Sequence, residues 1–170
     1  MTIVAIEPLG KHERADFSCG VAPLDDWFRQ RAGQDEKRNI ARVFVAVDDA
    51  LGVVGFYSLS TFTLSMDDMP PARAKKLPRY DLIPAALIGR LARDRRVAGR
   101  GVGGLLLADA VARIVAASDA LAVHAIVVEA KDEAAAAFYR GFGFDAFPRR
   151  PMRLFLPLHD AIAAVRKASS

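Results

Sequence analysis

The sequence predicts a single mixed α/β domain, and three observations support this prediction. The 170-residue chain is 52% hydrophobic and 26% charged, a balance typical of a globular domain. Runs rich in β-branched and aromatic residues alternate with runs whose apolar residues recur at helical spacing. No repeat, low-complexity tract or long linker divides the chain, so residues 1–170 are expected to fold as one domain.

The first half of the chain is expected to supply antiparallel strands and one helix. The helix is predicted at residues 23–39, where Leu24, Trp27 and Phe28 share one face. Residues 66–80 hold three prolines and four basic residues, which indicates a loop or an irregular crossing segment. The strands, of which the last two form a hairpin, are expected at residues 2–6, 42–48 and 52–65.

The second half is expected to contain strand–helix–strand units. Asp132 is interpreted as the N-cap of one of its helices and Gly141 as the end of that helix. The strands are predicted at residues 85–94, 121–130, 142–147 and 152–158. The helices are predicted at residues 102–117, 132–141 and 159–168.

Composition argues against several classes of protein. No apolar run reaches the roughly 20 residues that a membrane helix needs, and the N-terminus does not resemble a secretory signal. Cys19 is the only cysteine, so no internal disulfide can form, and a cytoplasmic location is the simplest expectation. His12, His124 and His159 lack the spacing of metal ligands, so no metal is expected.

Positive charge is concentrated in one part of the chain. The net charge of +4 permits a polyanionic partner without requiring one. Between residues 73 and 100, Asp81 and Asp94 are the only acidic residues. The basic residues in the same stretch are Arg73, Lys75, Lys76, Arg79, Arg90, Arg93, Arg95, Arg96 and Arg100.

Four glycines lie within six residues at "GRGVGG", residues 99–104, between a predicted strand and a predicted helix. We expect an anion site there, because N–H groups at a helix N-terminus point outward and glycines let an anion approach the main chain closely. The main-chain N–H groups of residues 97–104 are the expected donors. A Walker loop is excluded because Leu105 and Leu106 follow, and the GxGxxG spacing of a dinucleotide site fails by one residue.

Two motifs in this part of the chain resemble those of the GCN5-related N-acetyltransferases. "RVAGRG", residues 96–101, matches the Arg-x-x-Gly-x-Gly loop, and "AKDEAAAAFYRGFGF", residues 130–144, is similar to the later A-x-x-F-Y-x-x-x-G-F element. The resemblance implies a central, mostly antiparallel mixed sheet flanked by helices. It also implies acetyl-CoA as cosubstrate, with its pyrophosphate held by the glycine loop.

Two further stretches resemble the toxin branch of this family. These are "FSCGVAPLDDWF", residues 17–28, and "GRLARD", residues 89–94. The resemblance implies acetylation of the α-amine of aminoacyl-tRNA, inhibition of translation, a ribbon–helix–helix antitoxin and a homodimer. Ala98 departs from the Gln often found there, which affects one side-chain contact at most. Cys19 and Gly20 are interpreted as a turn that caps the first helix rather than as chemistry.

The resemblance also assigns residues to the binding of acetyl-CoA. Main-chain N–H groups near Leu91 to Arg93 are expected to bind pantetheine and polarise the thioester carbonyl. Arg96 and Arg100 are expected to add charge near the pyrophosphate. The expected acetyl-CoA-binding residues are Leu91, Ala92, Arg93, Arg96, Val97, Gly99, Arg100, Gly101, Val102, Gly103, Gly104 and Phe138.

Tyr139 is the candidate catalytic acid, with its hydroxyl expected near the sulfur to protonate the leaving thiolate. The alternative is a tyrosine that only packs beside Phe138. No general base is evident, because Asp94 lies beside arginines, Asp132 is explained as a cap and Glu129 as a strand end. A missing base favours an α-amine over a lysine, since the α-amine has the lower pKa.

Six basic residues are candidates for binding tRNA phosphates, although solvated surface charge explains each of them singly. They are Arg73, Lys75, Lys76, Arg79, Arg90 and Arg93. Arg149 and Arg150 form a second small patch. Two other functions stay open at this point: acetylation of a small amine or a protein N-terminus, and a non-catalytic regulatory module that binds coenzyme A.

Overall fold

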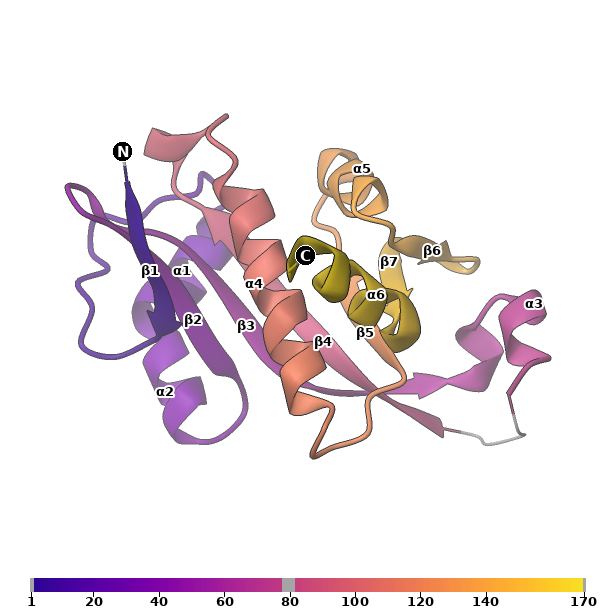
Figure 1. The fold of residues 1–170 in the computed structure, drawn as a ribbon. Coiled ribbons are helices and arrows are strands. Elements are labelled where there is room, and N and C mark those ends of the chain that lie inside the picture. The colour runs from indigo at the N-terminus through magenta and orange to yellow at the C-terminus, as the bar shows by residue number, and fades with distance from the viewer. Residues whose placement is uncertain (1, 78–81, 170) are drawn as a thin grey trace. The chain divides into compact units, whose positions relative to one another are not determined.

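The computed structural model describes residues 2–77 and 82–169, with seven strands and flanking helices in a mixed α/β fold (Figure 1). The described residues form two compact units. Unit 1 comprises residues up to Ser60 together with Gly89–Ala110, and unit 2 comprises Thr61–Ile88 and the residues from Val111 onward. Three long elements have residues in both units, and the single domain expected from the sequence stays a prediction.

Unit 1 contains the early antiparallel strands. The strands β1 (Ile3–Pro8), β2 (Arg42–Asp48), β3 (Gly52–Ser65) and β4 (Leu82–Arg93) are hydrogen-bonded in the order β1-β2-β3-β4. The hairpin predicted between β2 and β3 is confirmed, with Asp48 opposite Gly52. β4 begins at Leu82 rather than at residue 85, and its first residues belong to unit 2.

The prediction of one continuous helix at residues 23–39 is wrong, because the structure has two helices there. These are α1 (Ala22–Gln30) and α2 (Ala32–Lys37), separated at Arg31, whose φ of −118° departs from helical values. Gly33 lowers helix propensity directly after the break. The chain leaves α2 through Asn39, which has a left-handed φ of 60°.

The core of unit 1 lies between α1 and the strands. Phe28 stacks on Phe56 with ring centroids 4.1 Å apart, and Phe17 meets Phe56 edge-on at 5.5 Å. Gly55, the residue before Phe56 on β3, faces the opposite way, since successive residues alternate between the two faces of a strand. A Cβ at Gly55 would lie 2.8 Å from Leu106 of α4 (Val102–Ala117). Glycine therefore allows α4 to pack closely on β3.

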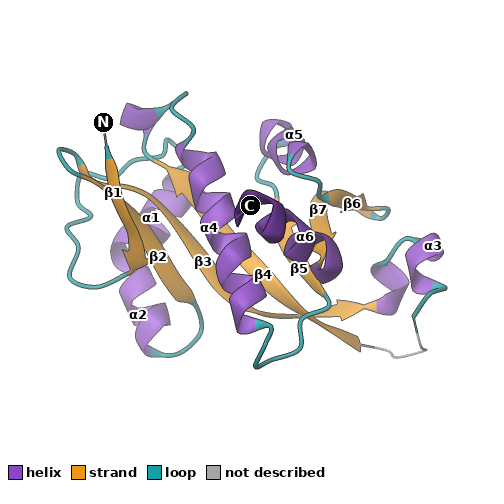
Figure 2. Ribbon diagram, viewed as in Figure 1, coloured by secondary structure: helices purple, strands orange, loops and turns teal. Residues whose placement is uncertain are grey.

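Unit 2 contains the later strands in the order β4-β5-β7-β6 (Figure 2). β5 (Ala125–Glu129) runs parallel to β4 and antiparallel to β7 (Arg150–Pro157), and β6 (Asp145–Phe147) is antiparallel to β7. Its core includes Leu64, Val127 and Phe155, all nearly inaccessible. The strands predicted at residues 121–130 and 142–147 are shorter than expected, because turns precede them.

The helices of unit 2 follow the prediction closely. They are α5 (Glu133–Gly141) and α6 (Leu158–Ser169), with the last part of α4. The N-cap assigned to Asp132 is confirmed, because its carboxylate accepts a hydrogen bond from the Ala135 N–H at 2.8 Å. No helix within residues 2–77 and 82–169 is long and apolar enough to cross a membrane.

The segment expected to be irregular at residues 66–80 contains two short helical turns. They are a 3-10 turn, η1 (Met66–Asp68), and α3 (Pro71–Ala74). Pro71 stands in the first turn of α3, where a missing N–H costs no hydrogen bond. The prediction is therefore corrected for this part. Arg79 lies outside the described residues.

Candidate active site

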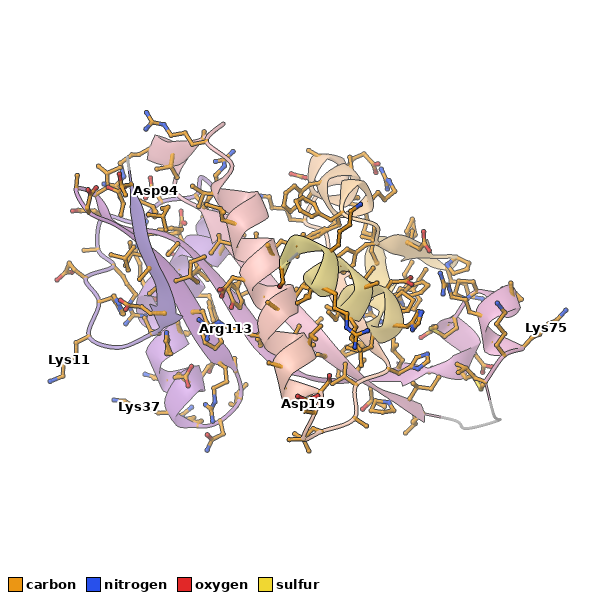
Figure 3. All side chains as sticks on the ribbon, viewed as in Figure 1. Lys11, Lys37, Lys75, Asp94, Arg113 and Asp119 are labelled. Atoms are coloured by element: carbon orange, nitrogen blue, oxygen red, sulfur yellow. The ribbon has the colours of Figure 1, made fainter. Side chains whose placement is uncertain are left out.

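Asp94 anchors the turn that follows β4 (Figure 3). Asp94 is 1% exposed, and its carboxylate accepts hydrogen bonds from the Ser18 N–H at 3.1 Å and the Arg96 N–H at 2.9 Å. Burial would raise the pKa of Asp94, but hydrogen bonds from the side chain and amide of Arg96 and from Ser18 outweigh burial and lower it. The Asp94 N–H donates to the Val54 carbonyl at 2.8 Å, which fixes the turn to β3.

The side chain of Arg96 forms an ion pair with Asp94. Its Nε lies 2.9 Å from Oδ1 of Asp94 and its Nη2 lies 3.0 Å from Oδ2, a two-point ion pair. This hydrogen bonding raises the pKa of Arg96. The positive charge expected to serve the coenzyme is therefore largely balanced inside the turn, whereas the side chain of Arg100 is exposed.

The N–H groups of the turn divide into two sets. Three of them already donate to carbonyl groups of the turn itself, around η2 (Arg95–Val97): the Val97 N–H to Asp94, the Ala98 N–H to Arg95 and the Arg100 N–H to Val97, at 3.2–3.3 Å. The expectation that all of residues 97–104 offer donors is corrected at these positions. The first helical bond of α4 runs from the Leu105 N–H to the Gly101 carbonyl. The N–H groups of residues 102–104 therefore precede the first N–H that donates within the helix, and they have no carbonyl acceptor in α4.

Two glycines of the turn are required by backbone conformation. Gly99 and Gly101 have φ values of 75° and 76°, in the left-handed region that other residues rarely adopt. A Cβ at either position would meet no atom of the described chain within 4 Å. They thus reverse the chain so that α4 starts with its N–H groups outward, a geometry suited to a phosphate.

The chain bends at Gly20 as expected, but the N-cap of α1 is Val21 rather than Cys19 or Gly20, and the bend is held by a residue of α1. The Cys19 N–H donates to Asp25 at 2.8 Å, and Gly20 has a φ of 87°. Asp25 is 6% exposed and also accepts a bond from the Ser18 hydroxyl at 3.3 Å. The "FSCG" stretch therefore links the start of α1 to Asp94 through Ser18.

Tyr139 lies on α5 in unit 2 and is 6% exposed. Its ring packs against Phe138 at 5.3 Å and Phe144 at 5.8 Å between centroids, so the packing role considered from sequence is real. Burial raises the pKa of Tyr139 to about 12. Its hydroxyl is therefore protonated at neutral pH, as a proton donor must be.

The carboxylates considered as bases are engaged elsewhere. Asp94 holds the turn, and Asp132 caps α5. Glu129 accepts two hydrogen bonds from Arg153, at 3.0 and 2.6 Å. The described residues contain no group of three or more His, Cys, Asp or Glu side chains able to hold a metal ion.

The candidate tRNA-binding residues differ in how firmly they are held. Lys75 and Lys76 are exposed after α3, and Arg73 pairs with Asp145 at 3.3 Å. Arg90 is half-buried, with its guanidinium 4.0 Å from the Trp27 ring centroid. Arg93 is also half-buried, on β4.

Sequence reasoning missed several residues that shape this region. They are Ser18, Asp25, Asp35 and Gly55, together with the contact of Trp27 with Arg90. The sequence did contain a signal for the close approach of α4. Val54 and Phe56 are large, and Gly55 between them has no side chain on the opposite face of the strand. The contacts of Ser18 with Asp94 and of Trp27 with Arg90 join residues that are distant in sequence, so no local pattern marks them.

Two named toxins resemble most of the chain. A probable toxin TacT from Sinorhizobium fredii is 35% identical and a tRNA-acetylating toxin from Mycobacterium tuberculosis is 40% identical. The matches cover 90% of both chains in the first case and 88% of both chains in the second. No family model matches the chain.

Solved structures agree with these relatives. A Tyr-to-Phe variant of KacT superposes with a TM-score of 0.88 at 27% identity, covering 96% of this chain and 99% of that one. AtaT complexed with acetyl-methionyl-tRNAfMet superposes with a TM-score of 0.86 at 28% identity, covering 94% of this chain and 98% of that one. A Tyr-to-Phe variant of AtaT was solved with the C-terminus of the antitoxin AtaR and with acetyl-CoA. It superposes with a TM-score of 0.80 at 25% identity, covering 94% of this chain and 96% of that one.

The fold and the glycine turn define a GCN5-related N-acetyltransferase. Within that class, identities of 35% and 40% over most of both chains place the protein in the family of tRNA-acetylating toxins, to which it belongs.

Proposed function

We propose that this protein transfers the acetyl group of acetyl-CoA to the α-amine of aminoacyl-tRNA and so blocks translation as the toxin of a toxin–antitoxin pair. The observation that carries the proposal is the turn after β4. There, buried Asp94 and the left-handed Gly99 and Gly101 direct the first N–H groups of α4 outward. The relatives named as tRNA-acetylating toxins support the choice of acceptor.

The acetyl donor is proposed to bind mainly through main-chain groups. The N–H groups of Val102, Gly103 and Gly104 supply donors for the pyrophosphate at the positive end of the α4 dipole. Main-chain groups of Leu91 to Arg93 are proposed to hold pantetheine and the thioester carbonyl. Ala92 is 4% exposed, so its contribution there is limited to the main chain.

In the proposed reaction the amine nitrogen attacks the thioester carbonyl carbon, and the carbon–sulfur bond then breaks. Tyr139 gives its hydroxyl proton to the departing thiolate and regains a proton from solvent, while the attacking nitrogen loses one proton to solvent. Holding both reactants together supplies much of the rate, on the order of 7–11 kcal/mol in favourable cases. Tyr-to-Phe variants of KacT and AtaT have been solved, which supports a functional role for a tyrosine in these proteins.

An α-amine acceptor fits the engaged carboxylates of the described chain. Asp94, Glu129 and Asp132 all hold other groups, so no base among them is available to deprotonate a lysine. An α-amine has a pKa of about 8 and lower beside an ester, so part of it is neutral without a base.

The proposal extends to partners and location. AtaT binds the C-terminus of its antitoxin AtaR, and we infer a ribbon–helix–helix antitoxin for this protein as well. A homodimer and a cytoplasmic location are proposed from the family resemblance. Size-exclusion chromatography with light scattering tests the dimer.

The test of the activity uses radiolabelled acetyl-CoA with charged and uncharged bulk tRNA. Label in charged tRNA alone is the expected result. Label in added polyamines or peptide N-termini but in neither tRNA pool would move the protein to another acceptor class. Binding of acetyl-CoA without label in any acceptor would indicate a regulatory module.

A further inference from the structure

The side chain of Arg90 is held in unit 1 by an arrangement that sets it apart from the surface cations. Its guanidinium lies 4.0 Å from the centroid of the Trp27 ring. The indole N–H donates to Asp35 at 2.9 Å, and Trp27 is 6% exposed, so the ring is fixed in place. The Arg90 N–H donates to the hydroxyl of Ser58, which is 2% exposed. Both ends of Arg90 are therefore positioned.

The charge of Arg90 is only partly compensated by the protein. Burial lowers the pKa of Arg90, and Asp35 opposes this from a distance. Among the described residues, none forms an ion pair with Arg90. A half-buried guanidinium that lies with one face on an aromatic ring and has no ion-pair partner presents its N–H edge to an incoming anion. Arg96, six residues later, differs from Arg90, because its guanidinium donates two hydrogen bonds to the carboxylate of Asp94.

The position of Arg90 on β4 determines which part of the acceptor its side chain can reach. Arg90 contacts Trp27, and Ala92 packs in the same core cluster as Trp27, so both side chains point to the α1 side of the strand. Residues 91–93 are the proposed thioester-binding stretch. Arg90 therefore lies directly beside the point where the acceptor amine must arrive.

We propose that Arg90, backed by Trp27 and Asp35, binds the phosphate on the 5′ side of the terminal adenosine of the acceptor. This inference rests on the proposed function. In an aminoacyl-tRNA, an ester and one ribose ring separate the α-amine from this phosphate. A planar guanidinium held on one face presents its N–H edge, which matches two oxygens of a phosphate. Arg90 is a positioning residue for the attacking amine.

The experiment compares two small acceptors that differ in this phosphate. One is an aminoacyl CpA dinucleotide and the other is the same aminoacyl adenosine, each carrying the amino acid found in labelled tRNA. Both have the adenine, the ribose and the ester, but only the dinucleotide has the phosphate. The variants are Arg90→Gln and Arg90→Lys, with Arg38→Gln at an exposed site as the control for net charge.

Arg90→Gln should lower kcat/KM for the dinucleotide by about 10-fold to 100-fold and change kcat/KM for aminoacyl adenosine by less than about twofold. Arg90→Lys should lie between wild type and Arg90→Gln, because it keeps the charge but loses the planar edge. Arg38→Gln should affect neither acceptor. Because each variant serves both acceptors, any loss of folded protein cancels in the ratio.

An equal loss on both acceptors, or no loss on either, would overturn the role of Arg90 while leaving the acetyltransferase proposal intact. If wild-type protein acetylates neither small acceptor nor charged tRNA, the proposed function fails, and the inference fails with it. If wild type acetylates charged tRNA alone, the same variants are compared on tRNA, where Arg90→Gln must still lose at least about 10-fold relative to Arg38→Gln.

Discussion

The glycine turn after β4 and the helix α5 contribute to the proposed reaction in different ways. The turn offers mainly main-chain groups, while Val97 is buried, Arg96 is paired with Asp94 and Arg100 is exposed. Helix α5 offers one hydroxyl on a ring that is otherwise packed. Substitutions in the turn should therefore act through backbone conformation and alter binding, whereas the decisive change in α5 is the loss of a single oxygen.

Tyr139→Phe should have the largest effect on catalysis. The variant keeps the ring contacts with Phe138 and Phe144 but loses the proton donor, so kcat should fall by about 100-fold or more while calorimetric binding of acetyl-CoA is unchanged. Since burial raises the pKa of Tyr139 to about 12, its ionisation should not reduce wild-type turnover between pH 7 and 10.

The matched control is Tyr57→Phe in unit 1, where the buried hydroxyl donates to Asp109 at 2.5 Å. It should lower the free energy of unfolding by about 1–2 kcal/mol with little change in kcat. Unchanged turnover in Tyr139→Phe would remove that hydroxyl from the mechanism and leave only its packing role.

Asp94→Asn tests whether the turn depends on its buried carboxylate. Losing the ion pair with Arg96 should lower the free energy of unfolding by about 2–3 kcal/mol, measured in urea, and weaken binding of acetyl-CoA. The pKa of Asp94 is lowered in the folded state, so its stabilisation is present above the unfolded value of about 3.9 and is lost as pH falls through the folded value. The difference between wild type and variant should therefore shrink below pH 4. A constant difference at all pH values would contradict this account.

Much of the fold could be predicted because its elements carry local signals. The hairpin of β2 and β3 follows from two β-branched runs, and the start of α5 from Asp132 as a cap. The break at Arg31 was missed because the residues of α2 are mostly good helix formers and include no proline, so nothing local marks an interruption. Local periodicity cannot report a change of direction that tertiary contacts, such as Trp27 with Asp35, stabilise.

The candidate site was predictable in its main chain and less so in its side chains. The glycines indicate an anion site because they let the chain reverse before a helix whose first N–H groups point outward. The pairing of Arg96 with Asp94 and the stacking of Arg90 on Trp27 were not predictable from charge counts. A run of arginines gives the amount of charge, whereas only the fold determines which of these charges are already neutralised.

Gly101→Ala should affect binding more than stability. A non-glycine residue at a φ of 76° costs about 1–2 kcal/mol, and the turn can relieve this strain by rotating the first N–H groups of α4 away from the phosphate. We expect acetyl-CoA to bind about 10-fold more weakly, measured by calorimetry. Gly52→Ala is the matched control, because Gly52 has a φ of 74° and also has room for a Cβ. It should show the same loss of stability with unchanged binding, and equal binding losses in both variants would refute the specific role of the turn.

The double change Lys75→Gln and Lys76→Gln should have the smallest effect. Both lysines are exposed, and Lys75 extends away from α3 (Figure 3), so stability should change by less than about 0.5 kcal/mol. If both contact tRNA phosphates, the slope of log kcat/KM for charged tRNA against log salt should become shallower by about 1.5. The control is Lys11→Gln with Lys37→Gln, two exposed lysines in unit 1. An equal change of slope in both pairs would mean that the basic segment acts only through net charge, and positioning of the acceptor would then depend on Arg90 rather than on the lysines.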